Sequence, residues 1–160
     1  MENELYSNTK YSFDREESKT IVINVPITSS TDHTFDVMLS ELIAIDKHSD
    51  VLLDSLTTYN CNTSDNSENN MGFILTINEF EVKSVSNTSS IGRSIFIPNE
   101  QTGTNVDTSK THKGKKLNYI CSINPTNINR LSGKITNING GSIFVGGSGR
   151  FIAEFVITSK

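Results

Sequence analysis

The chain has 160 residues, a formal net charge of −4 and a pI of about 5.3. This is the length of one domain, and the charge argues against a nucleic-acid binder that uses a whole basic face. Trp is absent, and Asn, Ser and Thr make up about a third of the residues, which favours β structure with many loops. No secretory signal opens the chain and no apolar run reaches the roughly 20 residues of a membrane span. We therefore expect neither secretion nor a membrane span.

The N-terminal segment is polar, mixed in charge and carries isolated aromatics at Tyr6, Tyr11 and Phe13. We predict that residues 1–18 form a flexible arm and that residues 19–160 form the folded domain. Two interpretations of the arm remain open: a disordered terminus, or a segment that orders against a neighbouring subunit with its aromatics as anchors.

The first half of the domain is predicted to consist of strands. Residues 20–25 alternate as a strand that Pro26 should end, because proline donates no ladder hydrogen bond. Residues 35–45 fit both a helix and a strand, and we favour a strand interrupted near Ser40 and Glu41. Residues 51–61 follow a period of two, with Val51, Leu53, Ser55, Thr57, Tyr59 and Cys61 expected on one face.

The middle of the chain alternates strands and polar loops. Residues 62–70 are predicted to be a loop and residues 71–77 a strand with one strongly apolar face. Phe80, Val82 and Val85 suggest an adjoining strand or a continuation past a bend. Residues 94–97 form a short strand, and residues 100–116 are expected to be a long loop of the functional or mobile kind.

Further strands close the chain. Residues 117–123 and 131–138 are predicted strands, the second with Gly133 inside it as a candidate bulge. Glycine pairs flank a short strand at 142–145. Together with the final run, this makes eight to ten strands without helical crossovers. We predict a single antiparallel β-sandwich, jelly-roll-like in form.

The final run, residues 150–159, is the strongest strand of the chain. Its residues 151, 153, 155 and 157 are apolar and its second face carries Ile152 and Val156. Such a strand lies deep in a sheet rather than at its edge. Two explanations remain for Ile152 and Val156: burial within the same chain, or a cover supplied by another subunit.

No group of residues indicates a reaction. His33, His48 and His112 lie in polar surroundings without ligand spacing, and no serine lies in a nucleophile elbow. Cys61 and Cys121 permit only one disulfide, and we favour buried free thiols. We therefore expect no enzyme, no catalytic or metal-binding residues and no cofactor.

One dense positive cluster precedes the strand at 117–123. It contains His112, Lys113, Lys115 and Lys116. These residues could solvate the start of that strand and discourage edge pairing, contact a partner, or hold a nucleic-acid backbone. We favour the first interpretation and rank nucleic acid last.

Four segments resemble small structural proteins in large DNA viruses of aquatic protists. The segments are IDKHSDVLLD at 45–54, IFIPNE at 95–100, HKGKKLNYICSINP at 112–125 and GRFIAEFVI at 149–157. The resemblance implies a non-enzymatic virion component, a minor capsid or cement protein with a jelly-roll-like sandwich. It carries over no site residues.

These observations predict a virion structural protein, assembled in the host cytoplasm, that contacts copies of itself or the major capsid protein. The candidate interface residues are Tyr6, Tyr11, Phe13, His112, Lys113, Lys115, Lys116, Ile152 and Val156. The rival hypothesis is a carbohydrate- or receptor-binding β-sandwich. Tyr59 beside Asn60 and Asp65 loosely matches an aromatic sugar platform.

Overall fold

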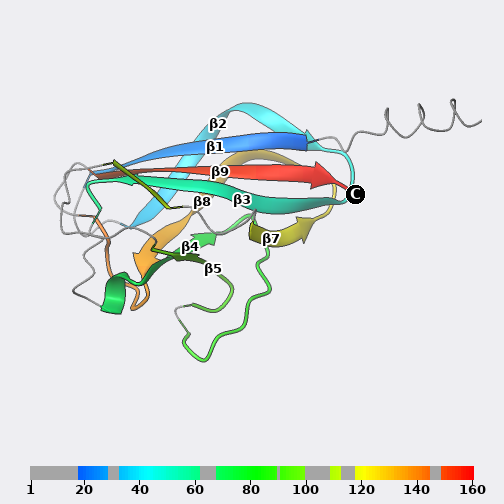
Figure 1. The fold of residues 1–160 in the computed structure, drawn as a ribbon. Coiled ribbons are helices and arrows are strands. Elements are labelled where there is room, and N and C mark those ends of the chain that lie inside the picture. Colours follow the sequence, from blue (N-terminus) through cyan, green and yellow to red (C-terminus); the bar gives the residue numbers. More distant parts are fainter. Residues whose placement is uncertain are drawn as a thin grey trace, which may run out of the picture.

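The computed structural model of the chain describes residues 18–28, 33–61, 68–89, 91–99, 109–112, 118–144 and 149–160. This part is all-β, an antiparallel sandwich of two sheets with one short 3₁₀ helix, η1 (Figure 1). The elements are β1 Ser18–Ile27, β2 Thr34–Ile45, β3 Ser49–Tyr59, η1 Glu68–Asn70, β4 Gly72–Ile77, β5 Ile95–Pro98, β6 Ser109–His112, β7 Asn118–Ile123, β8 Thr126–Asn137 and β9 Gly149–Ser159. The predicted fold class is confirmed.

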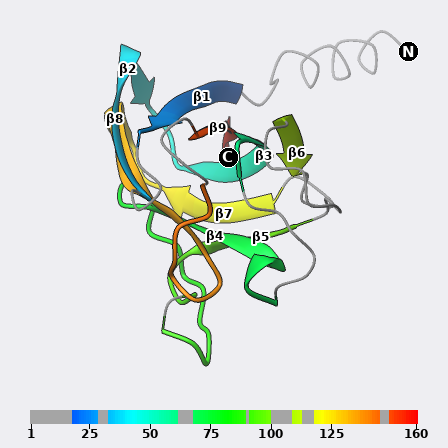
Figure 2. The same cartoon turned by 90° about the vertical axis from the view of Figure 1, so that its left-hand side faces the viewer.

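The strand order is that of a jelly roll. The first sheet runs β1-β9-β3-β6, with β7 also paired to β3, and the second runs β2-β8-β4-β5. Every pairing in both sheets is antiparallel. The first strand therefore pairs with the last, the second with the next to last, and so inward to the β4–β5 pair. This nesting is how a jelly roll wraps one long hairpin into two sheets. Figure 2 views the two layers from the side.

The core lies between the sheets, and β9 contributes a fully buried row to it. Phe151, Ala153, Phe155 and Ile157 are at most 2% exposed. The Phe151 ring meets Phe35 of β2 edge to face, with the ring centroids 5.3 Å apart. Aromatic contacts of this kind add to the free energy of burial. The last strand thus binds the two sheets together across the core.

Several predicted strands are longer than expected. β1 continues through Pro26 to Ile27, because β1 is an edge strand of its sheet and the missing N–H of Pro26 breaks no inner ladder. β2 is a strand throughout, as favoured, and its register with β8 shifts between Met38 and Ile43. The predicted interruption near Ser40 is this irregularity.

The predicted single face of residues 51–61 is wrong beyond Leu53. The register of β3 against β9 shifts between Leu53 and Ser55, which leaves Asp54 as an extra residue. A bulge of this kind exchanges the two sides of the strand that follows. Consequently Leu56 and Thr58 are buried, while Tyr59 is 41% exposed.

Three other expectations are corrected. Phe80 and Val82 lie in a turn and coil rather than in a strand. The Phe80 ring nevertheless enters the core, where its centroid lies 5.6 Å from that of Phe155. The predicted loop 100–116 contains β6. Of the predicted strand at 142–145, the described residues 142–144 form only an isolated bridge, between Phe144 and Cys61.

Gly133 marks a close backbone approach and not a bulge. It pairs in register with Phe35 of β2 and with Ile77 of β4. A Cβ atom on Gly133 would lie 1.8 Å from the carbonyl oxygen of Thr76. Only a residue without a Cβ therefore lets β8 approach β4 so closely here.

We predict that Gly133→Ala lowers the free energy of unfolding by about 2 kcal/mol, in the range measured for overpacked interiors, because the new methyl group meets backbone. Gly92→Ala is the matched control, since a Cβ there meets nothing within 4 Å. Urea unfolding followed by circular dichroism measures both. Equal stability of the two variants would contradict the assigned reason for Gly133.

Candidate functional site

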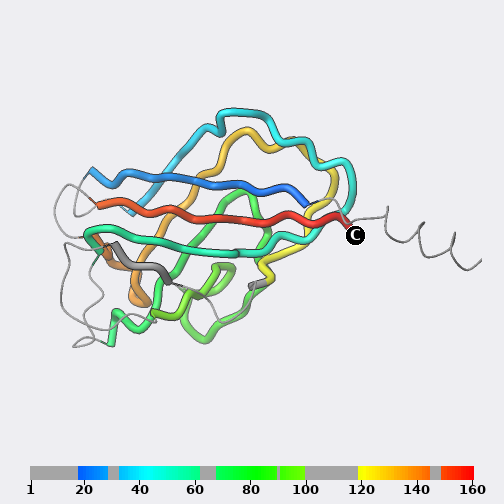
Figure 3. The backbone as a smooth tube through the Cα atoms, turned by 45° about the horizontal axis from the view of Figure 1, so that its top comes forward, coloured from blue at the N-terminus to red at the C-terminus, as the bar shows by residue number. Residues whose placement is uncertain are grey.

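The outward side of β1, β9 and β3 forms one continuous surface, which we call the β9 face. Figure 3 shows the three strands side by side. Because side chains alternate along a strand, the residues between the core positions point outward. From β1 through β9 to β3, the outward rows are Thr20, Val156 and Leu52; Val22, Glu154 and Ser55; Asn24, Ile152 and Thr57; and Pro26, Arg150 and Tyr59.

The β9 face exposes apolar side chains on the inner strand β9 and on the edge strand β1 beside it. Val22 is 55% exposed and Ile152 36%, while Val156 and Leu52 are half-buried. β9 is nevertheless an inner strand, paired with β1 on one side and β3 on the other. The structure therefore separates the two predicted roles of the last strand: its odd-numbered residues from 151 to 157 are core, and Ile152 and Val156 lie outside the core.

Two opposite charges flank Ile152 along β9. Arg150 lies two residues before it and is exposed, and its guanidinium donates to Asn24 Oδ1 at 2.6 Å. Glu154 lies two residues after it and accepts a long hydrogen bond, 3.5 Å, from Ser55 Oγ. The β9 face thus carries an apolar centre between a positive and a negative group.

The outward side of the second sheet has a different character. Arg130 of β8 forms a two-pronged ion pair with Asp36 of β2, and this contact lowers the pKa of the Asp36 carboxyl below its usual value. Glu79 accepts hydrogen bonds from the backbone N–H and the hydroxyl of Ser132, at 2.9 and 2.8 Å. Ile74, which also points away from the core, is fully buried. This side thus differs from the β9 face by its ion pair, although it also carries Met38, which is 69% exposed, and Phe96, which is 46% exposed.

A polar network closes the far end of the β9 face. Asp50 Oδ1 accepts from Lys160 Nζ at 2.9 Å and from Ser122 Oγ at 2.5 Å, and the Tyr119 hydroxyl lies 2.9 Å from Ser122 Oγ. The Lys160 hydrogen bond, with a second from Ser122, lowers the pKa of Asp50. These contacts join β3, β7 and the residue that follows β9.

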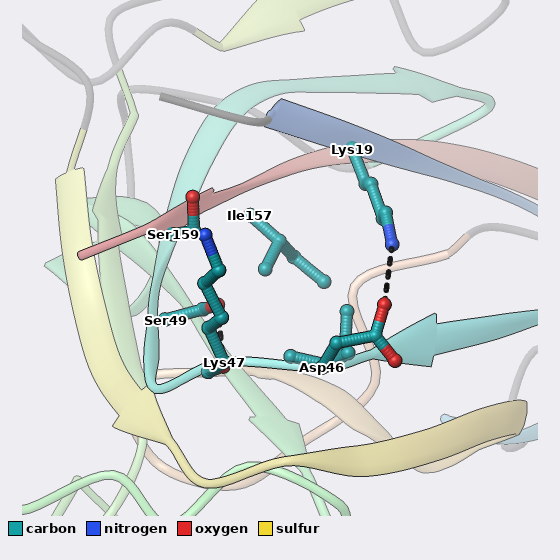
Figure 4. Close-up of a pocket in the computed structure, with 7 residues that line it drawn as sticks. Lys19, Asp46, Lys47, Ser49, Ile157 and Ser159 are labelled. Atoms are coloured by element: carbon teal, nitrogen blue, oxygen red, sulfur yellow. Dashed lines mark hydrogen bonds and ion pairs between the residues drawn. The ribbon is translucent and has the colours of Figure 1, made fainter. Parts of the chain in front are cut away.

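Neither of two hollows lined by described residues gathers reactive groups. One of about 20 Å³ lies between β1, β9 and the turn before β3, where Lys19 Nζ is 4.0 Å from Asp46 and donates to the Ala44 carbonyl at 2.6 Å (Figure 4). The other, about 340 Å³ and open, lies along β8, where Arg130 and Glu79 hold the contacts already described. No group of three or more metal-binding side chains is found in the described part of the chain.

The cysteines are buried free thiols, as favoured from the sequence. Burial is the main reason that the pKa of Cys121 rises to about 11, and the nearby Asp50 carboxylate adds to it. A thiol with such a pKa stays protonated at neutral pH and is a poor nucleophile.

The structure places only part of the predicted interface. Ile152 and Val156 lie together on the β9 face, and His112 ends β6 of the same sheet. Tyr6, Tyr11, Phe13, Lys113, Lys115 and Lys116 lie outside the described residues, as does the predicted arm up to residue 17. Of the loose sugar-platform match, Tyr59 is exposed, Asn60 is only 8% exposed, and Asp65 lies outside the described part.

Sequence reasoning missed Val22, Leu52, Arg150 and Glu154 as members of this surface. Val22 falls between the core residues Ile21 and Ile23, so the alternation of β1 carried the signal. The sequence does not give the strand order, and without that order Val22 cannot be placed beside β9.

Comparisons with known proteins give little. No protein-family model and no curated protein matches the sequence. Among solved structures, a chain in "Structure of infectious bursal disease virus Gt strain" is similar, with 15% sequence identity and a TM-score of 0.34. The alignment covers 91% of this chain and 33% of that one, so the present chain spans about a third of its length. Within the described residues, no helix has the length and apolarity needed to cross a membrane.

We predict that Ile152→Lys folds and changes the free energy of unfolding by less than about 1 kcal/mol, because residue 152 faces outward. Its matched control is Ala153→Lys, one residue along β9, where the side chain is fully buried. An unpaired charge there should prevent folding. Circular dichroism with urea titration distinguishes them, and unfolding of the Ile152 variant would place Ile152 in the core.

We predict that Asp50→Asn destabilises the fold at neutral pH and that its difference from the wild type shrinks as the pH falls below about 4. The pKa of Asp50 is lowered from 3.8 in the folded state, so its contribution exists above that value and is lost as the carboxylate is protonated. Urea unfolding at both pH values measures the difference. Asp54→Asn, an exposed carboxyl on the same strand, is the control, and a pH-independent difference for Asp50→Asn would refute the assignment.

Proposed function

We propose that the chain is a non-enzymatic structural subunit of a virion that acts through protein–protein contacts, with copies of itself or with a capsid lattice. The observation that carries this proposal is the β9 face, where Ile152 is exposed on an inner strand and Val22 is exposed on the edge strand beside it. Exposed apolar groups gathered on one flat surface are typical of protein-interaction sites.

The fold supports the same class of function. A jelly roll is used by viral capsid domains, and also by lectin domains. The segments at 45–54 and 149–157 that resemble virion structural proteins contain parts of β3 and β9, the strands that build the β9 face. A small capsid or cement component fits both observations.

We predict that antibodies against the purified chain label intact virus particles of its source in immunogold electron microscopy. We also predict that Ile152→Lys, made in the viral gene, reduces incorporation into particles. Met38→Lys is the matched control, because Met38 is 69% exposed and lies on the outward side of the other sheet. Unlabelled particles would contradict the virion location, and equal incorporation of the two variants would contradict the role of the β9 face.

The carbohydrate-binding alternative predicts a different result. It requires a sugar to dock near Tyr59, the exposed aromatic at the end of β3. Binding of the purified chain on a glycan array, lost in Tyr59→Ala, would favour it over the structural proposal.

A further inference from the structure

We infer that the β9 face binds a second copy of this chain, face to face and antiparallel, about a two-fold axis that passes at Ile152. This inference rests on the proposed function and names its partner. A two-fold contact uses the same patch on both copies, so the patch must complement itself. The sequence of charges along β9 decides whether it can.

Charge complementarity selects one arrangement. With the axis across the strands at Ile152, Arg150 of one copy lies over Glu154 of the other, and the reverse, so two opposite-charge contacts form at once. A two-fold axis along the strands would place Arg150 over Arg150 of the other copy. An axis across the strands at Glu154 would place the two Glu154 carboxylates together. Like charges facing each other disfavour both of these alternatives.

The neighbouring strands agree with the same axis. The row that contains Glu154 also contains Val22 and Ser55, and it would lie over the row that contains Pro26, Arg150 and Tyr59. The exposed Val22 then packs on the exposed ring of Pro26. The half-buried Ser55 hydroxyl faces the exposed Tyr59. Apolar, charged and hydroxyl groups each meet a suitable partner.

The size of the contact predicts its strength. Seven residues of β9 overlap in this arrangement, Ile152 and three on each side of it, and the four-residue strand β6 extends the same end of the sheet. At about 3.4 Å per residue and about 4.8 Å between strands, three strands of seven residues and the shorter β6 cover about 400 Å² per copy. The total of about 800 Å² falls in the class of weak, transient interfaces. We therefore expect a dimer that depends on protein concentration and weakens at high salt.

Charge reversal tests the inference with sedimentation equilibrium at low ionic strength. Arg150→Glu and Glu154→Arg should each weaken dimerisation about tenfold, since each change turns two attractive contacts into repulsive ones. Mixing the two single variants should restore association, because every contact between unlike copies again joins opposite charges. The double variant R150E/E154R should also dimerise like the wild type.

Two controls keep the result interpretable. Lys134→Glu reverses an exposed charge on the second sheet and should leave the dissociation constant unchanged, and circular dichroism checks that each variant is folded. A monomer at every concentration, or a mixture that does not associate, would overturn the second copy as partner. If association disappears when residues 1–17 are deleted, the β9 face would instead be the binding site of the N-terminal arm. None of these results alters the immunogold test, so the proposed function can stand when this inference fails.

Discussion

The rest of the structure depends on the pairing of β9 with both β1 and β3. The last strand lies inside the first sheet only because the first strand closes over one of its edges and β3 over the other. Its inner side chains then span the sandwich, where Phe151 meets Phe35 and Phe155 meets Phe80. Since strand side chains alternate strictly, a buried inner row obliges the other row to face outward. The same constraint therefore builds the core and leaves Ile152 on the outer surface of the sheet.

Much of the fold could be predicted from local pattern. The alternation in β1, β4 and β9 identified strands and their core faces, and the mixed period of residues 35–45 was resolved by their β surroundings. Positions that depend on other strands could not be predicted. The bulge at Asp54 exchanges the sides of β3 without a signal in its composition, and the need for glycine at 133 arises from the Thr76 carbonyl on another strand.

The candidate site was predicted in the same uneven way. Ile152 and Val156 stood out because apolar residues on both sides of a strand are unusual beside polar neighbours. Val22, Leu52 and Tyr59 belong to the same surface, but only the register of β1 and β3 against β9 brings them there. Arg150 and Glu154 look like ordinary surface charges in the sequence. They become candidate interface residues only because both lie two residues from Ile152 on the outward side of β9. The predicted arm and lysine cluster lie outside the described residues and stay predictions.

The central claim is that the inner side of β9 stabilises the fold and its outward side mediates association. Methyl NMR spectra recorded over a range of protein concentrations test it most directly. The account predicts concentration-dependent shifts for the methyl groups of Val22 and Ile152, and constant shifts for Met38 and Leu42 of β2. Constant shifts on the β9 face, or concentration-dependent shifts confined to β2, would contradict it.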